Sequence, residues 1–231
     1  MTDGTLPPWL PGVLELVDVR RKDRVLLVRP HCAEVVRAVE QLVGSAGSLT
    51  VVAPDEEQAV ALAQRLEGST ARIGHQFFRG HETYGTFDVA VVCPTTMFDG
   101  TLRGLASCLR GNLRPGGRFV VDLPPETPPA FLTLAMQALH WDEARQQAFR
   151  GPSEEQLATA LRDAGLRRVE PALSANLLRV SSPHDLADLW GAPFGLDARR
   201  SLAFGNALAS QLRSLGETEV LVHRTRVHGI R

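Results

Sequence analysis

The chain has 231 residues, of which 44% are hydrophobic, and its 25 basic and 26 acidic residues give a formal net charge of −1. This length suits one large domain with a proper core, and the balanced charge argues against binding to nucleic acid or to a membrane. No apolar run reaches about 18 residues, so we expect no transmembrane helix. The start of the chain lacks the basic and apolar regions of a secretory signal. The odd number of cysteines, Cys32, Cys93 and Cys108, without paired spacing predicts a reduced, cytoplasmic protein.

The first half of the chain alternates short apolar runs with amphipathic segments. A short helix is suggested near the start, and the later helices follow from apolar residues at helical spacing or from acidic residues that suit the helix dipole. Runs of β-branched residues indicate strands that are buried on both faces. The predicted helices are 14–19, 33–43 and 55–66, and the predicted strands are 24–28, 48–52 and 87–92.

A further helix is predicted to run from after Pro94 to about Asn112. Arg114–Gly117 reads as a turn, and residues 118–122 form the next buried strand. Strands that alternate with helices at this spacing argue for a parallel sheet covered on both faces. Because crossovers between parallel strands are right-handed, a doubly wound α/β sheet is the simplest architecture.

The last third of the chain is predicted to be mostly helical. Helices are expected over 127–150, 153–165 and 183–215, and the second opens with a capping-box pattern of Ser153 and Gln156. Short strands are expected at 167–169 and 177–180. Residues 219–228 alternate as an exposed edge strand would, which accounts for the charged His223, Arg224, Arg226 and His228.

We find no convincing linker, and we therefore predict a single domain over 1–231. Its parts are an N-terminal helical segment (1–23), a Rossmann-like core (24–170), and C-terminal helices with an edge strand (171–231).

Taken together, the order and spacing of these segments resemble the class I S-adenosylmethionine-dependent methyltransferases, in particular the type 11-like members. The matching segments are 24–28, 47–54, 87–92, 109–121, whose LRPGGR is close to a family signature, and 153–166. The resemblance implies a mostly parallel seven-stranded sheet with the last strand antiparallel. It also implies S-adenosylmethionine as the cofactor.

The cofactor-binding positions implied by the resemblance carry unusual residues. The family's G-x-G-x-G loop follows the first strand, because the backbone must turn tightly and approach the cofactor without a Cβ. Those three glycine positions hold Arg29, His31 and Ala33. The acid that binds the ribose hydroxyls is replaced by Ala53, and Asp55 is two residues further on.

Two further positions complete the cleft that the resemblance implies. A third acid of the family, near the adenine, falls at about His75, and Cys93 follows the strand at 87–92. His31, Cys32 and Cys93 could converge as soft metal ligands. Since no C-x-x-C or H-x-x-x-H pair supports such a site, we expect no metal and interpret the cysteines as small buried hydrophobes.

Three interpretations of the altered loop stay open. Arg29, His31 and His75 could bind a phosphate, carboxylate or nucleotide, because a helix N-terminus favours anions. Alternatively, these side chains plug a disused cleft, or the cleft binds S-adenosylmethionine through unusual contacts. Asp122, after the strand at 118–121, could face the cleft, but we interpret it as a capping or solvated residue.

Two functional hypotheses follow. The first is a methyltransferase-like protein without turnover that acts as a binding or interaction module, with a protein partner, a second copy of itself or a small anion as its ligand. The second is an active methyltransferase that acts on a small-molecule acceptor. Methyl transfer needs mainly proximity and orientation, so it demands no strict catalytic residue. The sequence favours the first hypothesis, because the loop from Arg29 to Ala33 lacks glycine.

Overall fold

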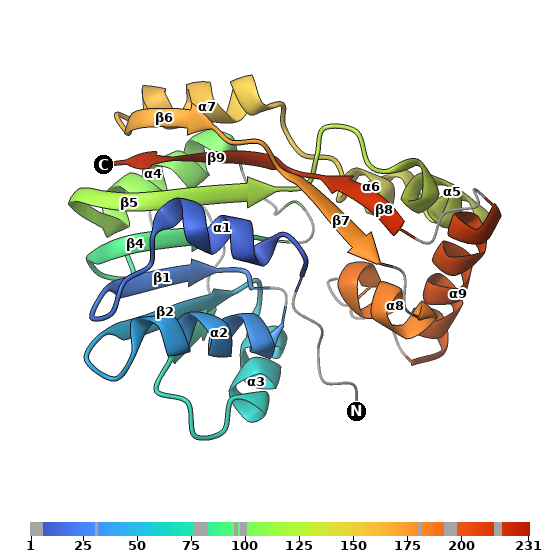
Figure 1. The fold of residues 1–231 in the computed structure, drawn as a ribbon, viewed down its shortest axis with the longest axis horizontal. Helices are drawn as coiled ribbons and strands as arrows, with labels where there is room; N and C mark the ends of the chain where they lie inside the picture. The colour runs from blue at the N-terminus through green and yellow to red at the C-terminus, as the bar shows by residue number, and fades with distance from the viewer. Residues whose placement is uncertain are drawn as a thin grey trace.

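The structure is a computed structural model of the whole chain. It describes residues 7–30, 32–75, 83–94, 97, 101–179, 182–191, 198–214 and 219–231. Two bodies are visible, a large sheet with helices on both faces and a smaller lobe beside it (Figure 1). Within the described residues, no helix is long and apolar enough to cross a membrane.

A seven-stranded sheet forms the centre of the larger body, and its strand order is β3-β2-β1-β4-β5-β9-β6. The strands from β1 to β5 pair with one another in parallel, whereas β9 runs antiparallel to both β5 and β6. The bounds are β1 Arg24–Val28, β2 Ser48–Ala53, β3 Arg72–His75, β4 Phe87–Val92, β5 Leu113–Leu123, β6 Arg167–Pro171 and β9 Thr225–Ile230. The predicted doubly wound sheet with an antiparallel last strand is confirmed.

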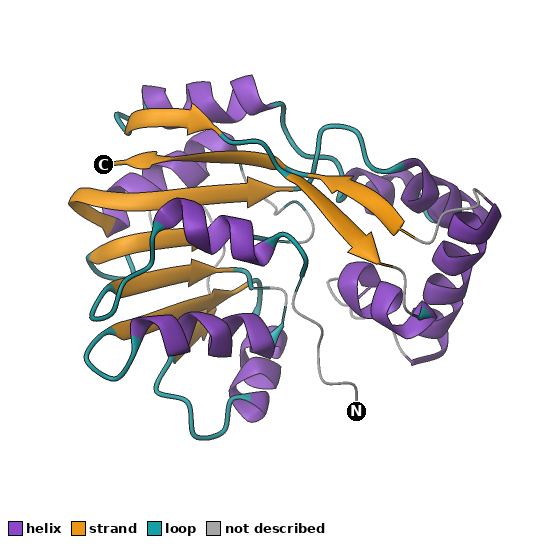
Figure 2. Ribbon diagram, in the orientation of Figure 1, coloured by secondary structure: helices purple, strands orange, loops and turns teal. Residues whose placement is uncertain are grey.

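Helices cover both faces of this sheet (Figure 2). One core joins the sheet to α1 (Leu10–Val17), α2 (Ala33–Val43) and α3 (Glu56–Arg65). A second core, on the other face, joins it to α4 (Leu102–Asn112) and α7 (Glu154–Asp163). Because β1 lies between β2 and β4, the strand order reverses at β1 and β4. Ligands of open α/β sheets bind at such a switch point, outside the carboxyl ends of the strands.

The smaller lobe lies beyond the carboxyl ends of β4 and β5 (Figure 1). It contains α5 (Ala130–Ala138), α6 (Glu143–Gln147), α8 (Pro183–Gly191), α9 (Ala198–Ser214) and an antiparallel pair, β7 (Ala175–Arg179) with β8 (Glu219–His223). The rings of Trp141 and Phe204 stack with their centroids 4.6 Å apart. Phe204 and Val222 belong to the same core as Leu27 of β1, which ties the lobe to the sheet.

The single exposed edge strand predicted at 219–228 is wrong. The chain makes two strands there, β8 and β9, which are separated at Arg224, and β9 lies inside the sheet between β5 and β6. The alternating charges suggested solvent, but Arg224 and Arg226 are only 5% and 3% exposed. Alternation of apolar and charged residues predicts a strand whose two faces differ. It does not show whether the charged face contacts water or a buried counter-ion.

Several local predictions are confirmed. The strands at 25–28, 49–52, 89–92 and 118–121 all form, and Ser153 and Gln156 make the capping box of α7. The predicted turn at 114–117 lies within β5, where the register with β4 jumps from Phe87↔Leu113 to Val89↔Arg118. The prediction of a turn is therefore wrong for this segment, although Gly116 has the positive φ, 75°, that favours glycine.

Candidate functional site

Arg29 follows β1 directly and occupies the switch point. Its backbone has φ 52°, and its N–H donates to the carbonyl of Val52 on β2 at 2.8 Å. A left-handed conformation is rare for a residue with a side chain and is typical of glycine. The backbone therefore turns at this position in a conformation that suits glycine, although an arginine side chain starts from it.

The other loop residues join this turn to α2. Cys32 is the N-cap of α2 with an extended backbone, and Ala33 is the first helical residue and only 1% exposed. His31, predicted to line the cleft, lies outside the described residues. Ala33 is the smallest of the three replacements, and its Cβ already points into the protein core.

The end of β2 offers no acidic side chain toward the sheet edge. Ala53 is fully buried and pairs in register with His75, which is exposed at the end of β3. Asp55 caps α3, because its carboxylate accepts from the Gln58 N–H at 2.8 Å and from Gln58 Nε2 at 3.2 Å. Since β2 separates β3 from β1, His75 and Arg29 follow strands that are not neighbours.

The two cysteines near the switch point are chemically quiet. Burial raises the pKa of Cys32 to about 11, and burial together with the Asp122 charge raises the pKa of Cys93 to about 12. Both thiols stay protonated near neutral pH, whereas a nucleophile or metal ligand needs the thiolate. In the part of the chain that the structure describes, no group of three His, Cys, Asp or Glu residues is placed to bind a metal.

A buried ion-pair cluster lies beside these residues, at the carboxyl end of β5. Asp122 is 0% exposed, and its Oδ1 accepts from Arg226 Nε at 2.7 Å. Its Oδ2 accepts from Arg224 Nε, and Arg224 Nη2 also donates to the Asp122 carbonyl at 2.8 Å. The predicted capping or solvated role of Asp122 is therefore wrong, because the strand places it opposite Arg226 in the adjacent β9.

This cluster also binds the carbonyl groups of Trp9, which precedes α1, and of Pro94, which follows β4. Arg224 Nη2 donates to the carbonyl of Pro94, and Arg226 Nη2 donates to the carbonyl of Trp9 at 3.2 Å. The Arg224 guanidinium stacks over the Trp9 ring, 4.5 Å from its centroid. A Cβ on Gly12 would lie 3.0 Å from Arg226 Nη1, so α1 passes close to the guanidinium where it has a glycine.

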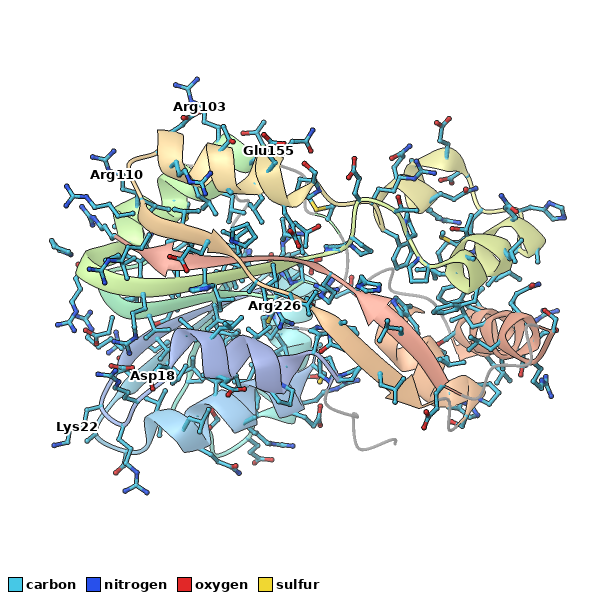
Figure 3. All side chains as sticks on the ribbon, turned by 45° about the horizontal axis from the view of Figure 1, so that its top comes forward. Asp18, Lys22, Arg103, Arg110, Glu155 and Arg226 are labelled. Carbon is cyan, nitrogen blue, oxygen red and sulfur yellow. The ribbon has the colours of Figure 1, made fainter. Side chains whose placement is uncertain are left out.

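The sequence did not predict this cluster, because Asp122 is about a hundred residues from Arg224 and Arg226 and each of these charged residues is of a type that usually lies at the surface. Figure 3 places Arg226 in the middle of the molecule, whereas Arg103 and Arg110 lie at its outside. The available signal was an acid inside a buried strand, Asp122 in an otherwise apolar run. Buried acids are nearly always paired, so such a residue predicts a buried cation elsewhere.

No protein-family model and no curated protein matches this chain. Several solved structures are similar to it in fold. A SAM dependent methyltransferase from Aquifex aeolicus is 12% identical, with a TM-score of 0.54 over 96% of this chain and 88% of that one. Phosphoethanolamine N-methyltransferase 2 from Haemonchus contortus, in complex with S-adenosyl-L-methionine, is 11% identical, with a TM-score of 0.60 over 96% of this chain and 52% of that one.

A third similar structure is named for a different reaction. The [4+2]-cyclase SpnF is 16% identical, with a TM-score of 0.59 over 96% of this chain and 80% of that one. At these identities the likeness shows the fold alone. The chain therefore has a class I methyltransferase-like fold, and its chemistry must be argued from its own residues.

Proposed function

We propose that this chain is a binding protein built on the methyltransferase fold and that it does not transfer methyl groups. The observation that carries the proposal is the buried cluster of Asp122, Arg224 and Arg226. It lies at the carboxyl end of β5, next to the switch point, where ligands of this architecture bind. Because the cluster is also bonded to Pro94 and Trp9, opening the edge would break several charge-assisted hydrogen bonds at once.

The residues on the cofactor side of the switch point support the same conclusion. Arg29 starts a long side chain from a turn that suits glycine, and Ala53 provides no acceptor for a ribose hydroxyl. A buried hydroxyl without a partner costs about 1–3 kcal/mol, so the loss of such acceptors weakens nucleoside binding substantially. Asp55 is already engaged in capping α3.

Exposed leucines on the smaller lobe support a binding role. Leu177 of β7 and Leu221 of β8 are cross-strand partners, and they are 53% and 51% exposed. Leu173, just before β7, is 88% exposed. Neighbouring exposed leucines on a two-stranded sheet are typical of a site where a protein partner or a second copy docks.

An active methyltransferase with a small-molecule acceptor is the second candidate. It is favoured by the fold, which the chain shares with a structure that contains S-adenosyl-L-methionine. That the described residues include no evident catalytic base does not count against it, because methyl transfer depends mainly on proximity and orientation.

Isothermal titration calorimetry with S-adenosylmethionine and with its demethylated product distinguishes the two candidates. We expect no binding heat for the wild type at ligand concentrations up to roughly 1 mM. The Arg29→Gly variant, which gives the turn its preferred residue, is the matched test of whether that side chain obstructs the cofactor. A wild-type dissociation constant in the low micromolar range would overturn the proposal and restore the enzyme hypothesis.

A further inference from the structure

A second concave site lies away from the switch point, between α4 and α7. It has a volume of about 720 Å³, within the range of roughly 300–1,000 Å³ that is common for small-molecule pockets. Three arginines line it, Arg103 and Arg110 of α4 and Arg231 after β9. Figure 3 shows Arg103 and Arg110 at the part of the surface that α4 and α7 form. Among the described lining residues, Asp163 is the one acidic side chain.

Two of these guanidinium groups are held in place by the protein backbone. Arg110 Nη1 donates to the carbonyl of Ala164 at the end of α7, at 2.6 Å. A Cβ on Gly165 would lie 2.8 Å from that same nitrogen, so a glycine with φ 84° makes room for it. Arg231 Nη1 donates to the carbonyl of Leu113. Each contact engages one of the five N–H groups of a guanidinium, which leaves the others available for a ligand.

Arg103 differs from the other two because, within the described chain, no hydrogen bond or ion pair engages it. It is exposed and lies seven residues before Arg110, two turns earlier on the same face of α4. Small side chains lie between the arginines, since Ser107, Gly111 and Ala160 also line the pocket. A ligand can therefore approach the helix surface closely, and the Ser107 hydroxyl adds a neutral donor.

The charges define the ligand class. The pocket lining combines three guanidinium groups with the Asp163 carboxylate, and the main-chain oxygen of Arg231 accepts from the Gly116 N–H at 2.9 Å. Planar guanidinium groups that are held in position match phosphate oxygens in a bidentate geometry. We propose that this pocket binds the phosphate groups of a small phosphorylated molecule. The proposal does not depend on whether the switch point binds S-adenosylmethionine.

Calorimetric titration of the full chain with inorganic pyrophosphate at low ionic strength tests the proposal. Wild type should bind, and Arg103→Gln should weaken binding about tenfold, because a charge-assisted hydrogen bond is lost from a side chain that holds no other contact. Asp163→Asn should tighten binding, since it removes the opposing charge. The control is Arg213→Gln on α9, an exposed arginine that does not line the pocket and whose replacement changes the net charge equally.

Three results would overturn the proposal. The first is that pyrophosphate gives no binding heat with the wild type. The second is that Arg213→Gln weakens pyrophosphate binding as much as Arg103→Gln does, which would indicate only a general charge effect. The third is that Arg29→Ala abolishes pyrophosphate binding while Arg103→Gln leaves the affinity unchanged. The last result would place the anion at the switch point instead. Folding of each variant is checked by its melting temperature, which Arg103→Gln should leave unchanged.

Discussion

Asp122 is the residue whose replacement should disturb this protein most. Its carboxylate is fully buried and faces two arginines that are themselves buried, so the described cluster contains two positive charges and one negative charge. Removing one partner of a buried ion pair leaves uncompensated charge in a medium that solvates it poorly. The hydrogen bonds from Arg224 to Pro94 and from Arg226 to Trp9 offset part of that cost in the native protein.

Asp122→Asn should therefore lower the free energy of unfolding by about 3–5 kcal/mol, measured by urea denaturation. Asp18→Asn is the control, because Asp18 pairs with Arg20 at the surface and should leave the unfolding curve unchanged. Replacing Asp122, Arg224 and Arg226 together by leucine or methionine should recover part of the loss, since well-packed apolar residues can substitute for a buried ion pair. A midpoint for Asp122→Asn equal to that of wild type would show that the cluster is not stabilising.

At the scale of elements, Glu40 links α2 to the loop before β3. Its carboxylate accepts from the Thr70 N–H at 2.7 Å, from the Thr70 hydroxyl at 2.8 Å and from the Ser69 hydroxyl at 2.9 Å. Burial alone would raise the pKa of Glu40, but the hydrogen bonds from Thr70 and Ser69 outweigh it and hold the pKa below its usual value. The charged form of Glu40 is thus favoured by folding.

The pH dependence of stability follows from this shift. A carboxyl group whose pKa is lowered by folding contributes stability above its unfolded pKa, near 4.5, and loses it as the pH falls through the folded pKa. Glu40→Gln should therefore destabilise the protein at pH 7, and its difference from wild type should shrink toward pH 3, measured by urea unfolding. Glu67→Gln, an exposed acid in the turn after α3, should show no difference at either pH. If the difference in unfolding free energy between Glu40→Gln and wild type stayed constant from pH 7 to pH 3, the Glu40 charge would not be the source of the stability.

For the whole molecule, the relevant question is whether the smaller lobe unfolds with the sheet. Phe204, Leu208 and Val222 of the lobe share one core with Leu27 and Val91 of the sheet. Arg224, between β8 and β9, is bonded to Asp122 of the sheet. Elements that share a core unfold together, so the prediction of one domain over 1–231 becomes a prediction of one cooperative transition.

Urea unfolding followed by tryptophan fluorescence and by circular dichroism should give coincident curves. Trp9 reports on the cluster, whereas Trp141 and Trp190 report on the lobe. Leu208→Ala, at a fully buried position of α9, should shift both curves together by about 2–5 kcal/mol. Leu202→Ala, an exposed position of the same helix, serves as the control. Two separate transitions would show that the smaller lobe and the sheet are separate folding units.

The sequence by itself determined the parallel strands at 24–28, 48–52 and 87–92, because each is a largely apolar run that fits few structures other than a buried strand. It also determined the unusual residues of the switch point, since Arg29 and Ala53 are fixed by their distance from those strands. Only the tertiary structure decided where the charges near the C-terminus lie. Alternation gives a strand its two faces, but whether Arg224 and Arg226 meet water or Asp122 depends on which strand becomes the neighbour, about a hundred residues away.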